Sequence, residues 1–282
     1  CMLPAPYWLT YPELIKMADA VPVIVETTEE SGFLADVRRL EKALTKKTKA
    51  IILNSPSNPC GCVYDRNRLE EIAAFAVENG LFVISDEIYD ELVYNGKQHV
   101  SIAALGEEIK RQTIVVNGMS KAYSMTGWRI GYTASEKPLA DAMGSYQSHA
   151  ASNPNSIAQY ASVAALTGPQ DFIAEMRRVF EKRRNLMHDM VNRIRGLSCR
   201  MPDGAFYIMV NISGVIGKTY EGRKITGSLD FSEMLLAATL TAVVPGIAFG
   251  ADNYVRLSYA TSEEKIKKGI ERMGEFAEML CS

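Results

Sequence analysis

Short apolar runs that alternate with helical patterns restrict the fold of this chain more than any other feature. Runs such as IIL, LFVIS and TIVV are apolar almost throughout, which is typical of strands covered on both faces. Strands of this kind, separated by helices, indicate βαβ units and a mostly parallel sheet. The predicted strands are Val21–Glu26, Ala50–Leu53, Leu81–Ser85, Thr113–Val116 and Trp128–Thr133, and the predicted helices include Ala35–Leu44 and Arg66–Asn79.

The pattern changes in the second half of the chain, where strands and helices follow one another in mixed order. We predict two domains: an α/β domain over residues 1–170, and a smaller α+β domain over residues 171–282. The sheet of the first domain is expected to carry helices on both faces. The elements predicted after residue 150 are helices Ser156–Leu166, Asp171–Arg195, Phe231–Thr239 and Ser262–Leu280, and strands Ala205–Val210, Val243–Val244 and Val255–Tyr259.

Charge and hydropathy exclude several classes of partner. The 282 residues include 31 Lys and Arg against 33 Asp and Glu. The chain therefore lacks the excess of basic residues that is typical of proteins that bind nucleic acid or an anionic membrane surface. The longest uncharged stretch covers residues 234–251. Pro245 and Gly246 interrupt it, so we predict a helix followed by a strand and a turn, not a membrane helix.

Five cysteines at irregular spacing do not predict a disulfide framework. They favour a reducing compartment, and we expect a cytoplasmic protein. Cys60 and Cys62 form a C-x-C pair, but no second Cys or His pair stands near them, and no metal site is expected.

Polar residues directly follow three of the predicted strands. Asn58 lies in the segment after the second strand, Asp86 follows the third, and Lys121 follows the fourth. Because ligands bind at the carboxyl ends of strands in open α/β sheets, these residues are candidates for one site. Taken singly, each also has a plain structural explanation: a turn residue, a helix N-cap or an exposed lysine.

The ordered motifs of the chain resemble those of the class I/II aminotransferases of fold type I, which use pyridoxal 5'-phosphate. The blocks are PAPYW, NSPSNPCG, SDEIYDELVY, NGMSKAYSMTGWRIGY, DGAFY and VRLSYA. The resemblance extends over the whole chain and is strongest to bacterial aspartate and aspartate/prephenate aminotransferases. It implies transfer of an amino group between an amino acid, with aspartate favoured, and a 2-oxo acid in a homodimer.

The resemblance also implies roles for the residues after the strands. Lys121 matches the lysine that holds the cofactor covalently and moves the α-proton of the substrate. Asp86 matches the buried carboxylate that keeps the pyridine nitrogen protonated, so that the ring accepts electrons. Tyr89 and Asn58 match the phenol and the amide that contact the 3′ oxygen of the cofactor; Asn58 is also expected near the substrate.

Further positions match residues around the phosphate, the ring and the substrate. Arg129 offers a planar fork suited to phosphate. Many relatives place Ser where this chain has Gly118, and Ser120 is expected to be a substitute donor. Trp8 matches the aromatic residue that stacks on the cofactor ring, although a core or interface Trp remains an alternative. Arg256 matches the partner of the substrate α-carboxylate, against the alternative of a surface arginine.

Two departures from the family pattern have consequences. Cys60 replaces the common Thr of N-P-T-G, so the contact of that hydroxyl is missing. Relatives also carry a further N-terminal portion with a glycine-rich phosphate loop, and we expect this sequence to be part of a longer protein. Two alternatives therefore remain beside transamination: a carbon–sulfur β-lyase of the same fold, which would release pyruvate and ammonia, and an inactive truncated fragment.

Overall fold

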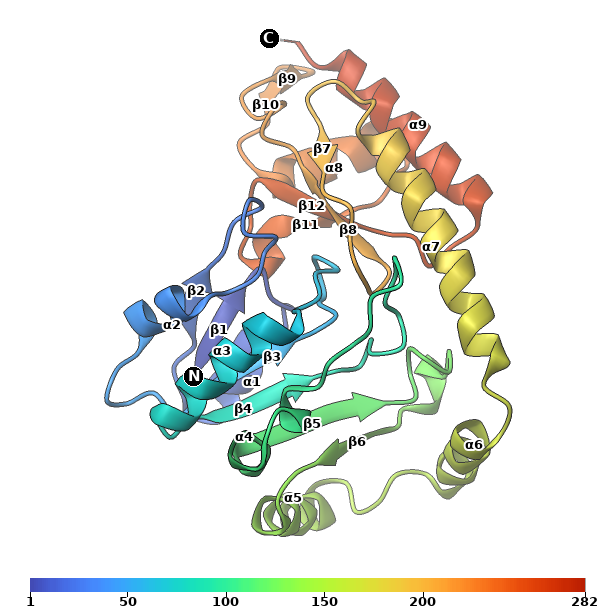
Figure 1. The fold of residues 1–282 in the computed structure, drawn as a ribbon. Coiled ribbons are helices and arrows are strands. Elements are labelled where there is room, and N and C mark those ends of the chain that lie inside the picture. The colour runs from blue at the N-terminus through green and yellow to red at the C-terminus, as the bar shows by residue number, and fades with distance from the viewer. Residues whose placement is uncertain (282) are drawn as a thin grey trace.

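The first half of the chain contains a six-stranded sheet in the computed structural model (Figure 1). The structure describes residues 1–281. The strand order is β2-β1-β3-β4-β5-β6. Neighbours from β2 to β5 are parallel, and β6 runs antiparallel to β5. The strands are β1 (Met2–Ala5), β2 (Val23–Glu26), β3 (Ala50–Asn54), β4 (Phe82–Asp86), β5 (Thr113–Gly118) and β6 (Gly131–Ala134).

Helices cover both faces of this sheet, as predicted. On one face, α2 (Val37–Ala43), α3 (Arg66–Glu78) and α4 (Glu107–Gln112) pack their apolar residues on Ile51, Leu53 and Val83. On the other face, Tyr11 and Ile15 of α1 (Tyr11–Met17) pack on Leu3 and Ile52. Alternate residues of β3 therefore contribute to two separate cores, which explains its uninterrupted apolar sequence.

A second core lies around a four-stranded antiparallel sheet of order β11-β12-β8-β7. Helices α7, α8 and α9 contribute buried residues to the same cluster. In Figure 1, α7 reaches from α6, beside the first sheet, to α9. The remaining elements are α5 (Lys137–Ala150), α6 (Ser156–Thr167), α7 (Asp171–Val191), β7 (Ser198–Cys199), β8 (Tyr207–Asn211), β9 (Thr219–Tyr220), β10 (Arg223–Lys224), α8 (Ser228–Thr239), β11 (Val244–Pro245), β12 (Tyr254–Ser258) and α9 (Glu263–Met279), with 3₁₀ turns at Ile102–Ala104, Thr126–Trp128 and Gly246–Phe249.

The largest differences from the prediction are one missed strand and two shifted boundaries; helices α1, α4 and α5 were not predicted either. No strand is predicted before residue 21, yet β1 lies between β2 and β3. The strand predicted from Trp128 begins only at Gly131, because Arg129 adopts a left-handed backbone conformation with φ of 53°. The helix predicted to reach Arg195 ends at Val191, where the Asn192 side chain donates to the carbonyl of Cys199 at 3.1 Å.

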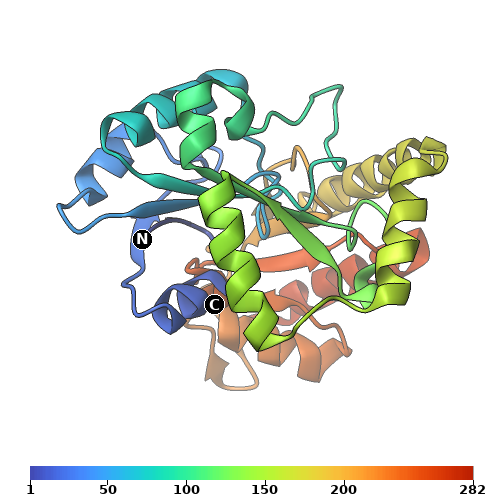
Figure 2. The same cartoon turned by 90° about the horizontal axis from the view of Figure 1, so that it is seen from below.

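The uncharged stretch at residues 234–251 folds as predicted, into the end of α8, then β11 and a 3₁₀ turn. None of the helices within residues 1–281 combines the length and the apolar character needed to cross a membrane. Seen from below, α5 and α6 lie at the side of the first sheet that ends with β6 (Figure 2). Their outer faces carry large exposed apolar side chains: Tyr146, Ile157, Tyr160 and Val163.

Candidate active site

The carboxyl ends of three neighbouring strands bring the candidate residues together. Asn54 ends β3, Asp86 ends β4, and Lys121 follows the end of β5 by three residues. Because these strands are parallel, their ends lie along one edge of the sheet. The second sheet adds Arg256, which lies in the middle of β12.

Asp86 is a largely buried carboxylate with fixed partners. The Tyr11 hydroxyl donates to Oδ2, and the backbone N–H of Ile88 donates to Oδ1 at 3.1 Å. Burial raises the pKa of Asp86, although the Tyr11 hydrogen bond, the Ile88 N–H and the positive charge of Lys121 oppose that rise. The carboxylate is therefore held in place and lies near a cation.

Asn58 links the first sheet to Arg256. The Asn58 backbone N–H donates to Asn54 Oδ1 at 2.7 Å, and Asn54 Nδ2 donates to the Asp86 carbonyl at 3.0 Å. The Asn58 side chain then accepts a hydrogen bond from Arg256 Nη1 at 2.8 Å. A chain of hydrogen bonds thus runs from the end of β4 to β12.

The guanidinium of Arg256 is packed between aromatic rings and retains an unused donor. Its central carbon lies 4.3 Å from the ring centroid of Tyr207 and 4.9 Å from that of Phe249. Burial lowers the pKa of Arg256. Its Nε is buried and has no hydrogen-bond partner among the described residues. A partly buried cation with an open donor is suited to binding a carboxylate in the fork geometry.

Lys121 lies half-buried below two aromatic rings. Its Nζ is 5.7 Å from the ring centroid of Tyr89 and 5.7 Å from that of Phe206. Burial lowers the pKa of Lys121, and the charges of Arg129 and Arg256 lower it further. A lower pKa leaves more of the amine neutral, which is the form that attacks a carbonyl carbon.

Tyr89 connects the two sheets beside Lys121. Its hydroxyl lies 3.1 Å from the hydroxyl of Tyr207, a residue of β8. Burial raises the pKa of Tyr89, and the neighbouring Tyr207 raises it further. The phenol therefore remains protonated and can donate a hydrogen bond to a ligand oxygen.

The other predicted residues lie at the margin of this group. Arg129 Nη1 donates to the carbonyl of Thr126 at 2.8 Å, and its charge acts on Lys121. Ser120, which directly precedes Lys121, is partly exposed. Trp8 packs edge-on against Tyr11, with ring centroids 5.3 Å apart. No hydrogen bond within residues 1–281 joins these three side chains to the other candidates.

Four residues of the site were not predicted: Tyr11, Asn54, Phe206 and Tyr207. Phe206 and Tyr207 belong to the DGAFY block, so the motif indicated their neighbourhood but not their contacts with Lys121 and Arg256. Nothing in the sequence identified Tyr11, which lies 75 residues before Asp86.

Comparisons with known proteins agree on one family. The model for "Aminotransferase class I and II" matches residues 1–273. The aspartate aminotransferase of Bacillus sp. strain YM-2 is 46% identical over 275 residues, which cover 98% of this chain and 69% of that protein.

Solved structures give the same result. The aspartate aminotransferase of Rhizobium meliloti superposes with a TM-score of 0.96 at 41% identity, and the match covers 99% of this chain and 70% of that one. The aromatic aminotransferase of Pyrococcus horikoshii has a TM-score of 0.91 at 40% identity, covering 97% of this chain and 72% of that one. The α/β architecture predicted from the sequence is therefore confirmed.

The donor set at the edge of the sheet fits pyridoxal phosphate. The fit requires a neutral-leaning lysine, a buried carboxylate for a pyridine nitrogen, and a phenol for a ring oxygen. Lys121, Asp86 and Tyr89 have these properties, and the open Nε of Arg256 adds a donor for a carboxylate. The chain belongs to the class I and II aminotransferases, and its activity is the pyridoxal phosphate-dependent transfer of an amino group.

Proposed function

We propose that this aminotransferase uses aspartate as amino donor and a 2-oxo acid, such as 2-oxoglutarate, as acceptor. The observation that carries the proposal is the partly buried guanidinium of Arg256, which Asn58 holds within electrostatic reach of Lys121. A carboxylate bound there lies close to the reactive amine. The likeness to the aspartate aminotransferases of Bacillus and Rhizobium supports aspartate as the donor.

We assign a separate task to each residue of the site. Arg256 binds the substrate α-carboxylate, with Asn58 fixing its guanidinium. Lys121 accepts the α-proton at Nζ, for which its lowered pKa is suited. Asp86 holds a proton on the pyridine nitrogen, and Tyr89 donates to the ring oxygen. When bound, pyridoxal phosphate supplies the electron sink that accepts the electron pair left by the departing proton.

The proposed phosphate and ring contacts are less central. Arg129 and Ser120 would hold the phosphate group, because Arg129 already acts electrostatically on Lys121 and Ser120 directly precedes it. Trp8 would stack on the ring from the side of α1, where it packs against Tyr11.

A panel of amino donors tests the substrate class. The purified protein, loaded with pyridoxal phosphate, is mixed with aspartate, phenylalanine or asparagine in the presence of 2-oxoglutarate. We expect oxaloacetate from aspartate as the fastest product, and no product from a Lys121→Ala variant. Faster release of phenylpyruvate would refute the aspartate assignment and favour an activity like that of the aromatic aminotransferase of Pyrococcus horikoshii.

Two further measurements address the two alternatives. A carbon–sulfur β-lyase would release pyruvate and ammonia from a cysteine conjugate without any 2-oxo acid; the transaminase names of the relatives do not favour it. An inactive fragment would form no borohydride-reducible adduct on Lys121. An adduct on Lys121 combined with turnover would contradict that alternative.

We also propose a homodimer. Tyr146 and Tyr160 are 77% and 79% exposed, and neighbouring apolar side chains of α5 and α6 are exposed with them. Clusters of exposed apolar side chains often mark protein–protein contacts, which supports burial against a second copy. Light scattering coupled to gel filtration tests the proposal: a mass of twice the chain is expected, and a monomer at micromolar concentration would contradict it.

A location, a metabolic role and a domain boundary complete the proposal. We propose a cytoplasmic location and a role in amino acid biosynthesis; the free state of all five cysteines supports a reducing compartment. We also propose a domain boundary near residue 170, between domains 1–170 and 171–282. The separate apolar clusters around β3 and β8 support it, and limited proteolysis with cleavage confined to residues near 170 would test it.

A further inference from the structure

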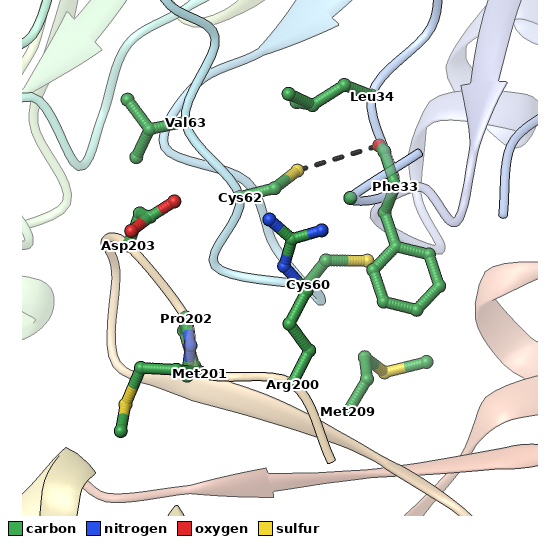
Figure 3. A pocket seen from close by; sticks show the side chains of 11 residues that line it. Phe33, Leu34, Cys60, Cys62, Val63, Arg200, Met201, Pro202, Asp203 and Met209 are labelled. Carbon is green, nitrogen blue, oxygen red and sulfur yellow. Dashed lines mark hydrogen bonds between the residues drawn. The ribbon is translucent and has the colours of Figure 1, made fainter. Parts of the chain in front are cut away.

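Cys60 and Cys62 lie in the loop between β3 and α3, four residues or fewer from Asn58. The reaction assigned above uses neither thiol. A small cavity of about 20 Å³ reaches both of them, and Arg200 and Asp203 also line it (Figure 3). This volume holds a molecule of about the size of water. Both thiols line this cavity, although Cys60 is only 7% exposed.

The two thiols form a local cluster with Ser57. Ser57 Oγ lies 3.1 Å from Cys62 Sγ. Cys62 Sγ donates to the Phe33 carbonyl at 3.6 Å (Figure 3). Only Gly61 separates the two cysteines in the sequence, and both side chains line the same cavity. No group of three or more His, Cys, Asp or Glu side chains suited to a metal occurs within residues 1–281, so redox chemistry suits the pair better than metal binding.

The surroundings make the two thiols unequal. The hydrogen bonds from Cys60 and Ser57 lower the pKa of Cys62, and the nearby Arg200 guanidinium lowers it further. Burial raises the pKa of Cys60 well above its usual value. Cys62 is also the less buried of the two cysteines. Because thiolates react with peroxides far faster than thiols do, we assign Cys62 as the attacking sulfur and Cys60 as the second sulfur.

We propose that Cys60 and Cys62 are an oxidisable dithiol, which a peroxide converts into a disulfide across Gly61. Cys62 first releases its proton to solvent. The thiolate then attacks one peroxide oxygen, the O–O bond breaks, and the leaving hydroxide takes up that proton from solvent as water. The Cys60 sulfur then attacks the Cys62 sulfenic acid, the S–O bond breaks, and the leaving hydroxide takes the Cys60 proton as water. The dithiol loses two electrons, and the peroxide is reduced to two molecules of water.

The geometry of the loop permits this bond. Cα atoms separated by one residue lie about 5–7 Å apart, which overlaps the range that disulfides bridge. Gly61 lies between them with φ of 63°. Its missing side chain matters, because a Cβ there would lie 2.6 Å from the Gly204 carbonyl oxygen.

Oxidation of the two cysteines would change the conformation of the loop that carries Asn58, and so affect the substrate site. The same loop is held by hydrogen bonds from the Asp203 and Gly204 N–H groups to the Gly61 carbonyl, at 2.9 and 2.8 Å. A disulfide removes the Cys62 S–H that donates to Phe33, and it forces a new conformation on residues 60–62. Asn58 lies in that loop and accepts a hydrogen bond from Arg256. We therefore expect Arg256 to bind the substrate carboxylate more weakly in the oxidised protein.

Mass spectrometry tests the modification directly. The protein is treated with hydrogen peroxide, denatured, alkylated and digested with trypsin; one peptide, residues 50–66, carries both cysteines. We expect this peptide unalkylated and lighter by two hydrogen atoms, and restored by dithiothreitol. In a Cys60→Thr variant, dimedone should label Cys62 instead. A Cys281→Ser variant, which changes an exposed cysteine elsewhere, should behave as wild type.

Activity measurements test the consequence. The oxidised enzyme should show a KM for aspartate raised several-fold, reversed by dithiothreitol, whereas Cys60→Thr should keep its KM after peroxide. Full alkylation of the 50–66 peptide, while other cysteines are oxidised, would overturn the proposal. A disulfide that leaves KM unchanged would overturn the link to Asn58.

Discussion

Replacing Arg256 by lysine isolates the fork of the guanidinium from its charge. The arginine makes one hydrogen bond to Asn58, and its buried Nε has no hydrogen-bond partner in the part of the chain that the structure describes. Lysine retains the positive charge but has a single nitrogen, so it cannot bind Asn58 and both oxygens of a carboxylate in one plane. The variant therefore loses the geometry of binding while the electrostatic attraction remains.

The magnitude follows from the hydrogen bonds that the substitution removes. One charge-assisted hydrogen bond contributes about 1.5–3 kcal/mol, and each 1.36 kcal/mol corresponds to about tenfold in rate. Removing one such hydrogen bond to the substrate carboxylate thus predicts a fall in kcat/KM for aspartate of about 10- to 100-fold. Cofactor affinity should change little, because Arg256 is assigned to the substrate.

The assay compares steady-state kinetics with cofactor titration on the same preparations. Arg223→Lys is the matched control, because Arg223 pairs with Asp230 and Glu233 on the surface, at 2.7 and 2.8 Å. This control should leave both quantities unchanged. An Arg256→Lys enzyme that loses cofactor affinity as strongly as kcat/KM, or that keeps the wild-type kcat/KM, would refute the assigned role.

Three further predictions concern buried groups. Tyr11→Phe removes the hydrogen bond that opposes the raised pKa of Asp86, so the acid limb of the kcat/KM profile should move to higher pH. Burial holds the folded pKa of Asp86 above its ordinary value of 3.8, so the cofactor-free protein should lose stability as pH rises from about that value through the folded pKa. Urea unfolding at a series of pH values measures this loss. The Asp86→Asn variant should not show it, because its side chain does not titrate. Arg184→Met should destabilise the protein by about 1–3 kcal/mol in urea, because the 2.9 Å hydrogen bond to the buried Pro202 carbonyl is removed.

The central strands of the first sheet were predictable because their apolar runs are uninterrupted. Residues 50–54 and 82–86 are apolar on both faces, and helices cover both faces. The strand Met2–Ala5 was missed because Pro4 and Pro6 interrupt its apolar run, and proline is typical of turns and edge strands. Its place between β2 and β3 is decided by tertiary packing, which the local sequence does not encode.

The site was predictable only in part for a related reason. Asn58, Asp86 and Lys121 follow strands that share one edge, and motif resemblance added their roles. Tyr11 and Tyr207 enter through contacts between distant segments; the hydrogen bond from Tyr11 joins residues 75 positions apart. The open Nε of Arg256 is likewise a property of packing, since it depends on which donors the neighbouring atoms already satisfy.

Two of the contacts between the first and the second sheet join residues assigned to the reaction. Arg256 bonds to Asn58 across 198 positions of sequence, and Tyr89 meets Tyr207 across 118. Each pair joins the edge of the first sheet to a strand of the second. A substrate carboxylate on Arg256 and a cofactor on Lys121 would therefore bridge the same two units. Their binding stabilises the docked arrangement by linkage, and any loosening of that arrangement weakens their binding by the same free energy.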